Sequence, residues 1–240
     1  MSKFKKLSVA LVMGLSMAGS AFAADGLTVS GDVHGASAHQ YRGYQFSDGE
    51  ASIGAAITAS HASGLFGSVQ TDTIKLTQGS GRNQAHTALS VGYGQVLPHD
   101  VKVEGGVTRN IFSGKDGVSD LSFSEVFLGA EYQGAYAKLS TVIEGSKLGV
   151  PGFTSGDTYG ELGYTHNIGK FAVGGDIGYT WHDTAYTNVK DGLSVAQVRA
   201  GYAVNDHVDV TVTHQFAGDD IFGNRAAGTH KTLVKVAYKF

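Results

Sequence analysis

The 240-residue chain contains no cysteine, only two prolines and few charged residues, which make up 16% of its length. Without cysteine it can form neither a disulfide nor a thiolate metal site, and it has no cysteine nucleophile. It also lacks any apolar run of roughly 18 residues, the length of a transmembrane helix. The classes that remain are soluble proteins and membrane proteins that cross the bilayer with strands.

Glycine is abundant instead, with 35 residues. This is about twice the usual share, and without a collagen period it indicates many short turns and crowded strands. The formal net charge of −3 becomes more negative once the lysine-rich N-terminus is removed. The charge therefore argues against a nucleic-acid partner.

Residues 1–23 have the features of a secretory signal peptide. Lysines within residues 3–6 give a positive start, residues 7–18 form an apolar segment, and Ala21-Phe22-Ala23 matches the small-x-small cleavage pattern. We predict Sec-type export, cleavage near Ala23 and one domain from residue 24 to residue 240. A soluble periplasmic protein is the alternative that the rest of the sequence has to exclude.

The segment after the signal alternates with a period of two, as a half-buried strand does. In 171–182 the odd positions are mostly apolar or aromatic, and the even positions are small or polar. The last strand ends on Phe240, with Val236 and Tyr238 on the same face. A terminal aromatic residue after alternating apolar positions is the usual ending of a bacterial outer-membrane barrel. We therefore predict that Tyr238 and Phe240 form the signal for the barrel-assembly machinery.

Twelve alternating segments predict an all-β fold, a transmembrane antiparallel β-barrel. They are 27–36, 51–61, 65–75, 85–96, 101–112, 121–132, 135–144, 158–166, 171–182, 193–204, 208–216 and 229–240. Short connections alternate with longer loops rich in Gly, Asp, Ser and Asn, which is the asymmetry of an outer-membrane barrel. A soluble sandwich would show the same alternation, but the signal peptide, the loop asymmetry and Phe240 favour the barrel.

An internal repeat supports this register. Tyrosines recur on the apolar face, one hairpin apart and just before a short turn or the C-terminus, at Tyr93, Tyr132, Tyr164, Tyr202 and Tyr238. Such positions are typical of the aromatic girdle at a membrane interface.

The polar face of these segments carries most of the charge, and in a barrel this face lines the lumen. Its nine acids are Asp32, Asp72, Glu104, Glu125, Glu131, Glu144, Glu161, Asp176 and Asp209. Its six bases are Lys102, Lys138, Arg199, Lys231, Lys235 and Lys239. We expect the pore to be lined chiefly by Arg42, Asp32, Lys102, Glu104, Glu125, Lys138, Glu161, Asp176, Arg199, Asp209 and Lys235. The acidic excess predicts a mild preference for cations.

Arg42 has two interpretations that the sequence leaves open. It is either the basic member of a constriction, on a loop folded into the lumen beside Tyr41, Tyr44 and Phe46, or a residue that pins this loop by stacking and by pairing with Asp48. Lys75 and Arg109 are the charged residues of the apolar face, both near loop ends. Arg109 is placed to snorkel or to meet a lipid phosphate.

The first long loop carries a family resemblance. Tyr41-Arg42-Gly43 and Ser47-Asp48-Gly49 precede the Gly-rich strand Ile53-Gly54-Ala55-Ala56-Ile57 and the turn His61-Ala62-Ser63-Gly64-Leu65. This stretch resembles the N-terminal hallmark of the TorF family, Gly-rich proteobacterial outer-membrane proteins whose porin activity is inferred from their barrel character. Further matches are Phe123-Ser124-Glu125 and Tyr159-Gly160-Glu161-Leu162-Gly163-Tyr164. The resemblance implies a porin fold rather than a particular substrate, and Gln45-Phe46 between the two motif halves departs from the pattern.

No motif predicts a metal site, a cofactor or a phosphate loop. The ten histidines form no His-x-x-x-His or His-Glu-x-x-His pair, and the Gly-rich segments precede no helix. Outer-membrane hydrolases place a Ser and a His on the outer surface of neighbouring strands, and His214 does lie on the apolar face. The predicted register puts Val198 opposite His214 and leaves Ser194 too far along the strand for a hydrogen bond. We therefore expect no enzyme activity and keep a lipid hydrolase as a minor alternative.

The sequence thus predicts a porin-like channel of the bacterial outer membrane for passive diffusion of small hydrophilic solutes or ions. A twelve-stranded barrel leaves space beyond its side chains, whereas an eight-stranded one is nearly filled. The expected partners are outer-membrane lipids, the barrel-assembly machinery and the solutes, with the oligomeric state left open. The alternative from another class is a surface-interaction barrel, adhesin-like or receptor-like, that contacts a host molecule or a phage through loops such as 145–157 or 217–228.

Overall fold

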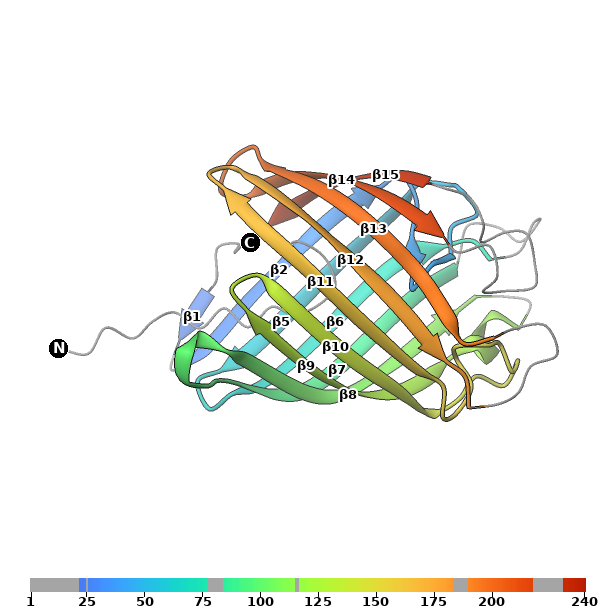
Figure 1. Ribbon diagram of the computed structural model, residues 1–240. Coiled ribbons are helices and arrows are strands. Elements are labelled where there is room, and N and C mark those ends of the chain that lie inside the picture. Colours follow the sequence, from blue (N-terminus) through green and yellow to red (C-terminus); the bar gives the residue numbers. More distant parts are fainter. Residues whose placement is uncertain (1–21, 25, 77–83, 115–116, 184–189, 218–230) are drawn as a thin grey trace.

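The protein is a closed β-barrel of twelve antiparallel strands (Figure 1). The computed structural model describes residues 22–240 except 25, 77–83, 115–116, 184–189 and 218–230. The barrel strands are β2 (Leu27–Ala36), β5 (Ser52–His61), β6 (Leu65–Ile74), β7 (Gln84–Val96), β8 (Lys102–Ser113), β9 (Phe123–Tyr132), β10 (Ala135–Glu144), β11 (Thr158–Ile168), β12 (Phe171–Trp181), β13 (Gly192–Ala203), β14 (Val208–Ala217) and β15 (Lys231–Lys239).

Three short strands lie outside the barrel wall. β1 (Phe22–Ala24) pairs with β2, and β3 (Gln40–Tyr41) pairs with β4 (Tyr44–Gln45) in a small hairpin. Two 3-10 turns, Pro98–Asp100 and Val118–Leu121, are the helical elements of the described residues. In that part of the chain no helix has the length and hydrophobicity to span a membrane.

The barrel closes where the last strand meets the first. β15 pairs with β2, with Tyr238 opposite Val33 and Lys239 opposite Asp32. Phe240 and Gly31 exchange two backbone hydrogen bonds of 3.0 Å each. Closure gives each of the twelve wall strands a neighbour on both sides, so none of these strands is an edge strand. The predicted fold and strand number are confirmed, and the observed strand ends lie within two residues of the predicted ones. The predicted start of the last strand, 229–230, lies outside the described residues.

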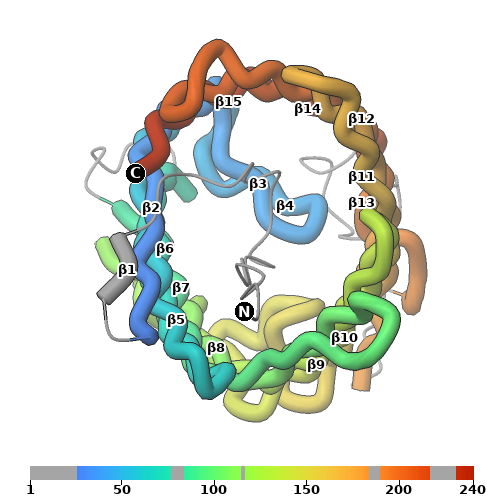
Figure 2. Tube along the Cα trace, turned by 90° about the vertical axis from the view of Figure 1, so that its left-hand side faces the viewer, coloured from blue at the N-terminus to red at the C-terminus, as the bar shows by residue number. Residues whose placement is uncertain are grey.

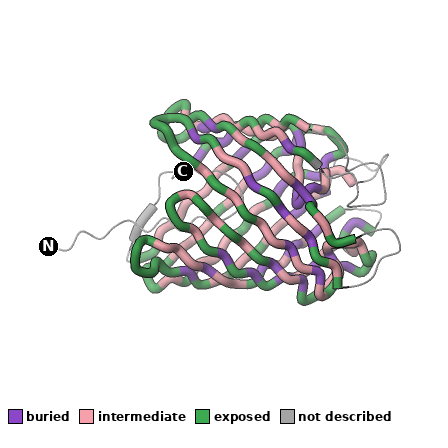
Figure 3. Tube along the Cα trace, viewed as in Figure 1, coloured by how far each residue is buried: buried purple, intermediate pink, exposed green. Residues whose placement is uncertain are grey.

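The outer face of the wall is apolar. Ile53, Val91 and Leu128 are exposed, along with apolar side chains from the other barrel strands (Figure 3). An exposed apolar band of this extent is the surface that a transmembrane barrel presents to lipid. The repeated tyrosines lie on this face, all exposed, near the end of the barrel that has the short turns. We call this the short-turn end and the opposite one the loop end.

The packed core lies inside the barrel, at the loop end. Residues 37–50, here named the lumen loop, fold into the lumen, where the β3–β4 hairpin hangs from the wall (Figure 2). Their aromatic side chains pack with residues of the wall and of the loop 145–157 in a buried cluster of Tyr41, Phe46, Ile74, Phe112, Val118, Phe123, Val142 and Phe153. The loop end of the lumen therefore contains a solid plug on one side.

The tip of the hairpin reaches the wall at β13, the third strand from β2 around the barrel. Arg42 and Gly43 both have positive φ, 51° and 88°. A Cβ on Gly43 would lie 2.4 Å from the carbonyl oxygen of Ser194 on β13. Only glycine allows this approach, because any side chain would collide with the backbone of the wall. The lumen loop thus spans the part of the lumen between β2 and β13.

One expected lumen residue is on the outside. The pairing of β9 with β10 shifts between Val142 and Glu144, as at a β-bulge, so that Glu144 faces Ser124. Ser124 lies on the outer face with Arg109, whose Nη1 donates to Glu144 at 2.5 Å. The placement of Glu144 in the lumen was wrong, because a bulge reverses the alternation of all later residues in its strand.

Candidate functional site: the polar lumen

Arg42 holds the lumen loop to the wall. Its Nη2 donates to Glu125 on β9 at 2.6 Å, and the guanidinium stacks on Tyr41 and on Tyr159 of β11, 4.9 and 4.6 Å from the ring centroids. Arg42 therefore pairs with Glu125 rather than with Asp48, which is exposed. Burial alone would disfavour the charge, but the attraction of Glu125 prevails and raises the pKa of Arg42 above its ordinary value.

A chain of histidines and carboxylates fastens the base of the same loop. His34 on β2 hydrogen-bonds Asp32 at 2.6 Å and Asp72 on β6 at 2.8 Å. His39 in the loop lies 3.7 Å from Asp72 and contacts His86 on β7 at 3.4 Å. The two ends of the hairpin are therefore held by different polar clusters on different parts of the wall.

A second polar network lies deeper in the lumen. Arg199 on β13 pairs with Asp176 on β12 and donates to the hydroxyl of Tyr136 at 2.8 Å. Tyr136 in turn donates to Glu161 at 2.9 Å. Beside this network, the Lys138 ammonium lies 4.6 Å from the ring centroid of Phe127. These contacts connect strands β9 to β13 and fix their charged side chains against the wall.

Further ion pairs lie on both sides of the barrel closure and on β8. Lys239 pairs with Asp209 at 2.6 Å, and Lys102 pairs with Glu131 at 2.6 Å. Lys235 is 4.0 Å from Asp32, whose carboxylate already accepts the shorter bond from His34. Of the predicted lining residues, Arg42, Glu104, Glu125, Asp176 and Asp209 are buried, so they pack against their neighbours instead of standing free in a channel.

The charge balance of the lumen differs from the expected one. Glu144 is on the outer face, and Arg42 is inside. Counted over the strands as before, eight acids and six bases therefore face the lumen, and the lumen loop adds Asp48 and Glu50 as well as Arg42. The acidic excess of the strands falls from three to two, and the cation preference stays a prediction.

Sequence reasoning missed two residues that hold the base of the lumen loop, His34 and His86, and one that joins the second polar network, Tyr136. His34, His86 and Tyr136 lie on the polar phase of their strands, so alternation alone would have placed them in the lumen. Their partners come from distant segments, which no local pattern indicates. Among the described residues, no group of three or more His, Asp or Glu side chains is arranged to hold a metal ion.

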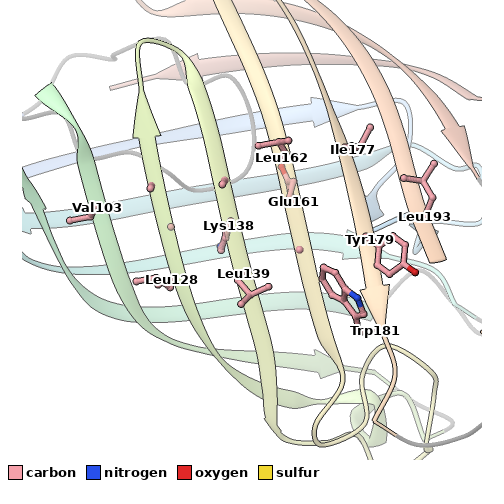
Figure 4. Close-up of a pocket in the computed structure, with 14 residues that line it drawn as sticks. Val103, Leu128, Lys138, Leu139, Glu161, Leu162, Ile177, Tyr179, Trp181 and Leu193 are labelled. Carbon is pink, nitrogen blue, oxygen red and sulfur yellow. The ribbon is translucent and has the colours of Figure 1, made fainter. Parts of the chain in front are cut away.

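The outer wall carries a groove and a histidine of its own. The groove, about 510 Å³, crosses β9 to β13 between large side chains such as Leu128, Leu162 and Trp181 (Figure 4). Its apolar lining suits contact with hydrocarbon chains. On β14, His214 lies opposite Val198 and contacts Thr232 at 2.9 Å.

The serine weighed for a hydrolase is not on this surface. Ser194 is buried on the lumen side, where its hydroxyl hydrogen-bonds Thr180. The predicted register of His214 is confirmed, and the wall separates Ser194 from it.

No family model and no curated relative matches the chain. Solved structures do resemble it. The KdgM porin has a TM-score of 0.52 at 10% identity, over 88% of this chain and 98% of that one. The NanC porin has a TM-score of 0.50 at 12% identity, over 88% and 98%.

A third similar structure belongs to an enzyme. The outer membrane phospholipase A from Escherichia coli has a TM-score of 0.52 at 13% identity, over 88% of this chain and 92% of that one. At such low identities the likeness establishes the fold alone. Porins and a phospholipase share this barrel, so the activity has to be argued from the residues of the chain itself.

Proposed function

We propose that the protein is a passive channel of the bacterial outer membrane for small hydrophilic solutes or ions. The observation that carries this proposal is the exposure of Lys235. It lies in the middle of β15, faces the lumen beside Asp32, and its side chain is 41% exposed. A side chain that is open to solvent at this point favours a water-filled path beside the plug, as expected for a twelve-stranded barrel.

The family and export signals fit this function. The Arg42 and Asp48 motifs resemble the TorF family, and residues 1–23 resemble a Sec-type signal with cleavage near Ala23. Tyr238 and Phe240, at the strand that closes the barrel, are the proposed signal for the barrel-assembly machinery. The exposed apolar belt requires outer-membrane lipids as its surroundings.

Planar-bilayer recording of the refolded mature protein tests the channel. We expect discrete conductance steps that scale with salt concentration and are absent from mock-refolded samples. A correctly folded barrel without conductance would contradict the proposal and favour the surface-interaction alternative.

The loop 145–157 suits that alternative less well, because Phe153 is buried in the plug and Tyr44 donates to the carbonyl of Pro151. The loop 217–228 lies outside the described residues except for Ala217.

No enzyme activity is part of this proposal. His214 and Thr232 lie within the distance that a base and a hydroxyl nucleophile need, but a hydrolase also needs a group that orients the base and one that stabilises an oxyanion. A phospholipid hydrolysis assay of the refolded barrel with His214→Ala as control checks this point, and turnover that depends on His214 would contradict it.

A further inference from the structure

Three lysines form a column along the inner face of β15. Lys231, Lys235 and Lys239 are four residues apart, so alternation puts them on one face, the same face as Asp32 and Asp209. Four residues of a strand span about 13 Å, and the column is therefore roughly 26 Å long. Because the strands of such a barrel are tilted by roughly 35–45°, the column covers about 20 Å of the apolar band, which is about 25 Å tall. The column extends through the lumen from the loop end to the short-turn end.

Most of the lumen acids on the strands are less accessible than Lys235. Five of the eight are buried: Asp72, Glu104, Glu125, Asp176 and Asp209. The other three are each engaged, Asp32 by His34, Glu131 by Lys102 and Glu161 by Tyr136. The Asp32 side chain is 20% exposed, against 41% for Lys235. Among the charges of the strands, a solute in the channel therefore meets Lys235 more readily than these buried or engaged acids, although the acids are more numerous than the bases.

Pairing along the column is strongest at the short-turn end. Lys239 is buried against Asp209, whereas Lys235 is 4.0 Å from a carboxylate that His34 already occupies. Lys231 has intermediate exposure, and among the described residues no carboxylate lies within ion-pair distance of it. Two ammonium groups thus remain available to a mobile anion in the loop-side half of the lumen.

We propose that the channel prefers small anions, chloride and short organic carboxylates, over cations, and that the lysine column of β15 carries this selectivity. The inference rests on the proposed channel function. Exposed ammonium groups in a narrow, low-dielectric lumen raise the local concentration of anions. The two opposite charges of a buried ion pair have little effect on a distant ion, because their electric fields nearly cancel there. A series of ammonium groups also lets an anion pass from one weak site to the next without being held.

Reversal potentials across a KCl gradient test the proposal on the full refolded barrel. The wild type should show a chloride-to-potassium permeability ratio above one. Lys235→Gln and Lys231→Gln should each shift the reversal potential toward the cation side, and Lys235→Arg should keep it. The matched control is Lys147→Gln, whose side chain is 85% exposed in the loop 145–157 and should leave the potential unchanged. All shifts should shrink at about 1 M salt, where the Debye length is near 3 Å.

Liposome swelling gives a second measurement that does not depend on ion gradients. Gluconate should enter wild-type proteoliposomes faster than the similarly sized neutral sorbitol, and Lys235→Gln should reduce that difference. Circular dichroism and heat-modifiable gel mobility verify that each variant is folded. A conducting barrel that is cation-selective, or whose selectivity ignores both lysine substitutions, overturns this inference alone. A folded barrel without conductance overturns the channel function itself.

Discussion

At the scale of single residues, the ion pair of Arg42 with Glu125 decides whether the lumen loop stays in place. Arg42→Met should leave Glu125 buried without a partner. Removing one member of a buried ion pair lowers the free energy of unfolding by about 3–5 kcal/mol. Arg42→Glu should release the loop further, since two carboxylates would then face each other. We expect the double variant Arg42→Met with Glu125→Gln to recover most of the lost stability. Urea unfolding in phospholipid vesicles measures these free energies, and strictly additive effects would refute the coupling.

His39 gives the same loop a dependence on pH. Burial lowers the pKa of His39, and its neighbours act in both directions: Asp72 favours the charge, whereas His34 and Lys235 oppose it. The Nδ1 atom of His39 faces Asp72, and its Nε2 atom faces the ring of His86. A lowered pKa means that the folded loop keeps the imidazole neutral, so its contribution to stability is complete above the ordinary pKa of 6.5 and is lost as the pH falls below it.

The expected outcome is faster hydrogen exchange in residues 37–50 at about pH 5 than at about pH 7.5, after correction for the intrinsic rates. His39→Gln should remove most of this difference. His99→Gln, in an exposed turn at the short-turn end, is the matched control. Equal pH dependence in the wild type and in His39→Gln would show that another group controls the loop.

At the scale of elements, the hairpin β3–β4 depends on close contact with β13 of the wall. Gly43→Ala places a Cβ 2.4 Å from the carbonyl oxygen of Ser194, at a φ of 88°. Gly49→Ala has a similar φ of 76° but meets only the end of the Gln45 side chain, so it controls for backbone strain. We expect Gly43→Ala to increase hydrogen exchange and current fluctuations far more than Gly49→Ala. Similar effects of both would mean that contact with β13 is unimportant.

The strand β15 closes the barrel, and its last residue completes the closure. Phe240 exchanges two backbone hydrogen bonds with Gly31. Its ring packs closely over Gly31, because a Cβ added to Gly31 would lie only 2.8 Å from the Cζ atom of Phe240. Phe240→Asp should therefore lower the yield of assembled barrel in the outer membrane, whereas Phe240→Leu should have a small effect. The yield is measured as the heat-modifiable fraction in outer-membrane preparations. Wild-type assembly of Phe240→Asp would exclude the proposed role of the terminal residue.

At the scale of the whole molecule, the barrel separates an apolar outside from a charged inside. Leu128→Arg puts a charge on the exposed outer face of β9, which costs about 2–4 kcal/mol near the bilayer midplane. Leu233→Lys adds a charge on the lumen face of β15 and should be tolerated. Equilibrium folding into vesicles compares the two, and equal destabilisation would argue against a lipid-facing outer wall.

The sequence by itself determined the strands and their two faces. Alternation is a local property, because successive side chains of a strand point to opposite sides, so twelve segments and most of the lumen residues could be read directly. The tertiary structure decided where the loop residues lie and which charges remain accessible. Arg42 meets Glu125 across 83 positions of sequence, and the shift between Val142 and Glu144 moves one acid outside. Such contacts arise only when the closed wall brings distant segments together, since no local periodicity encodes them.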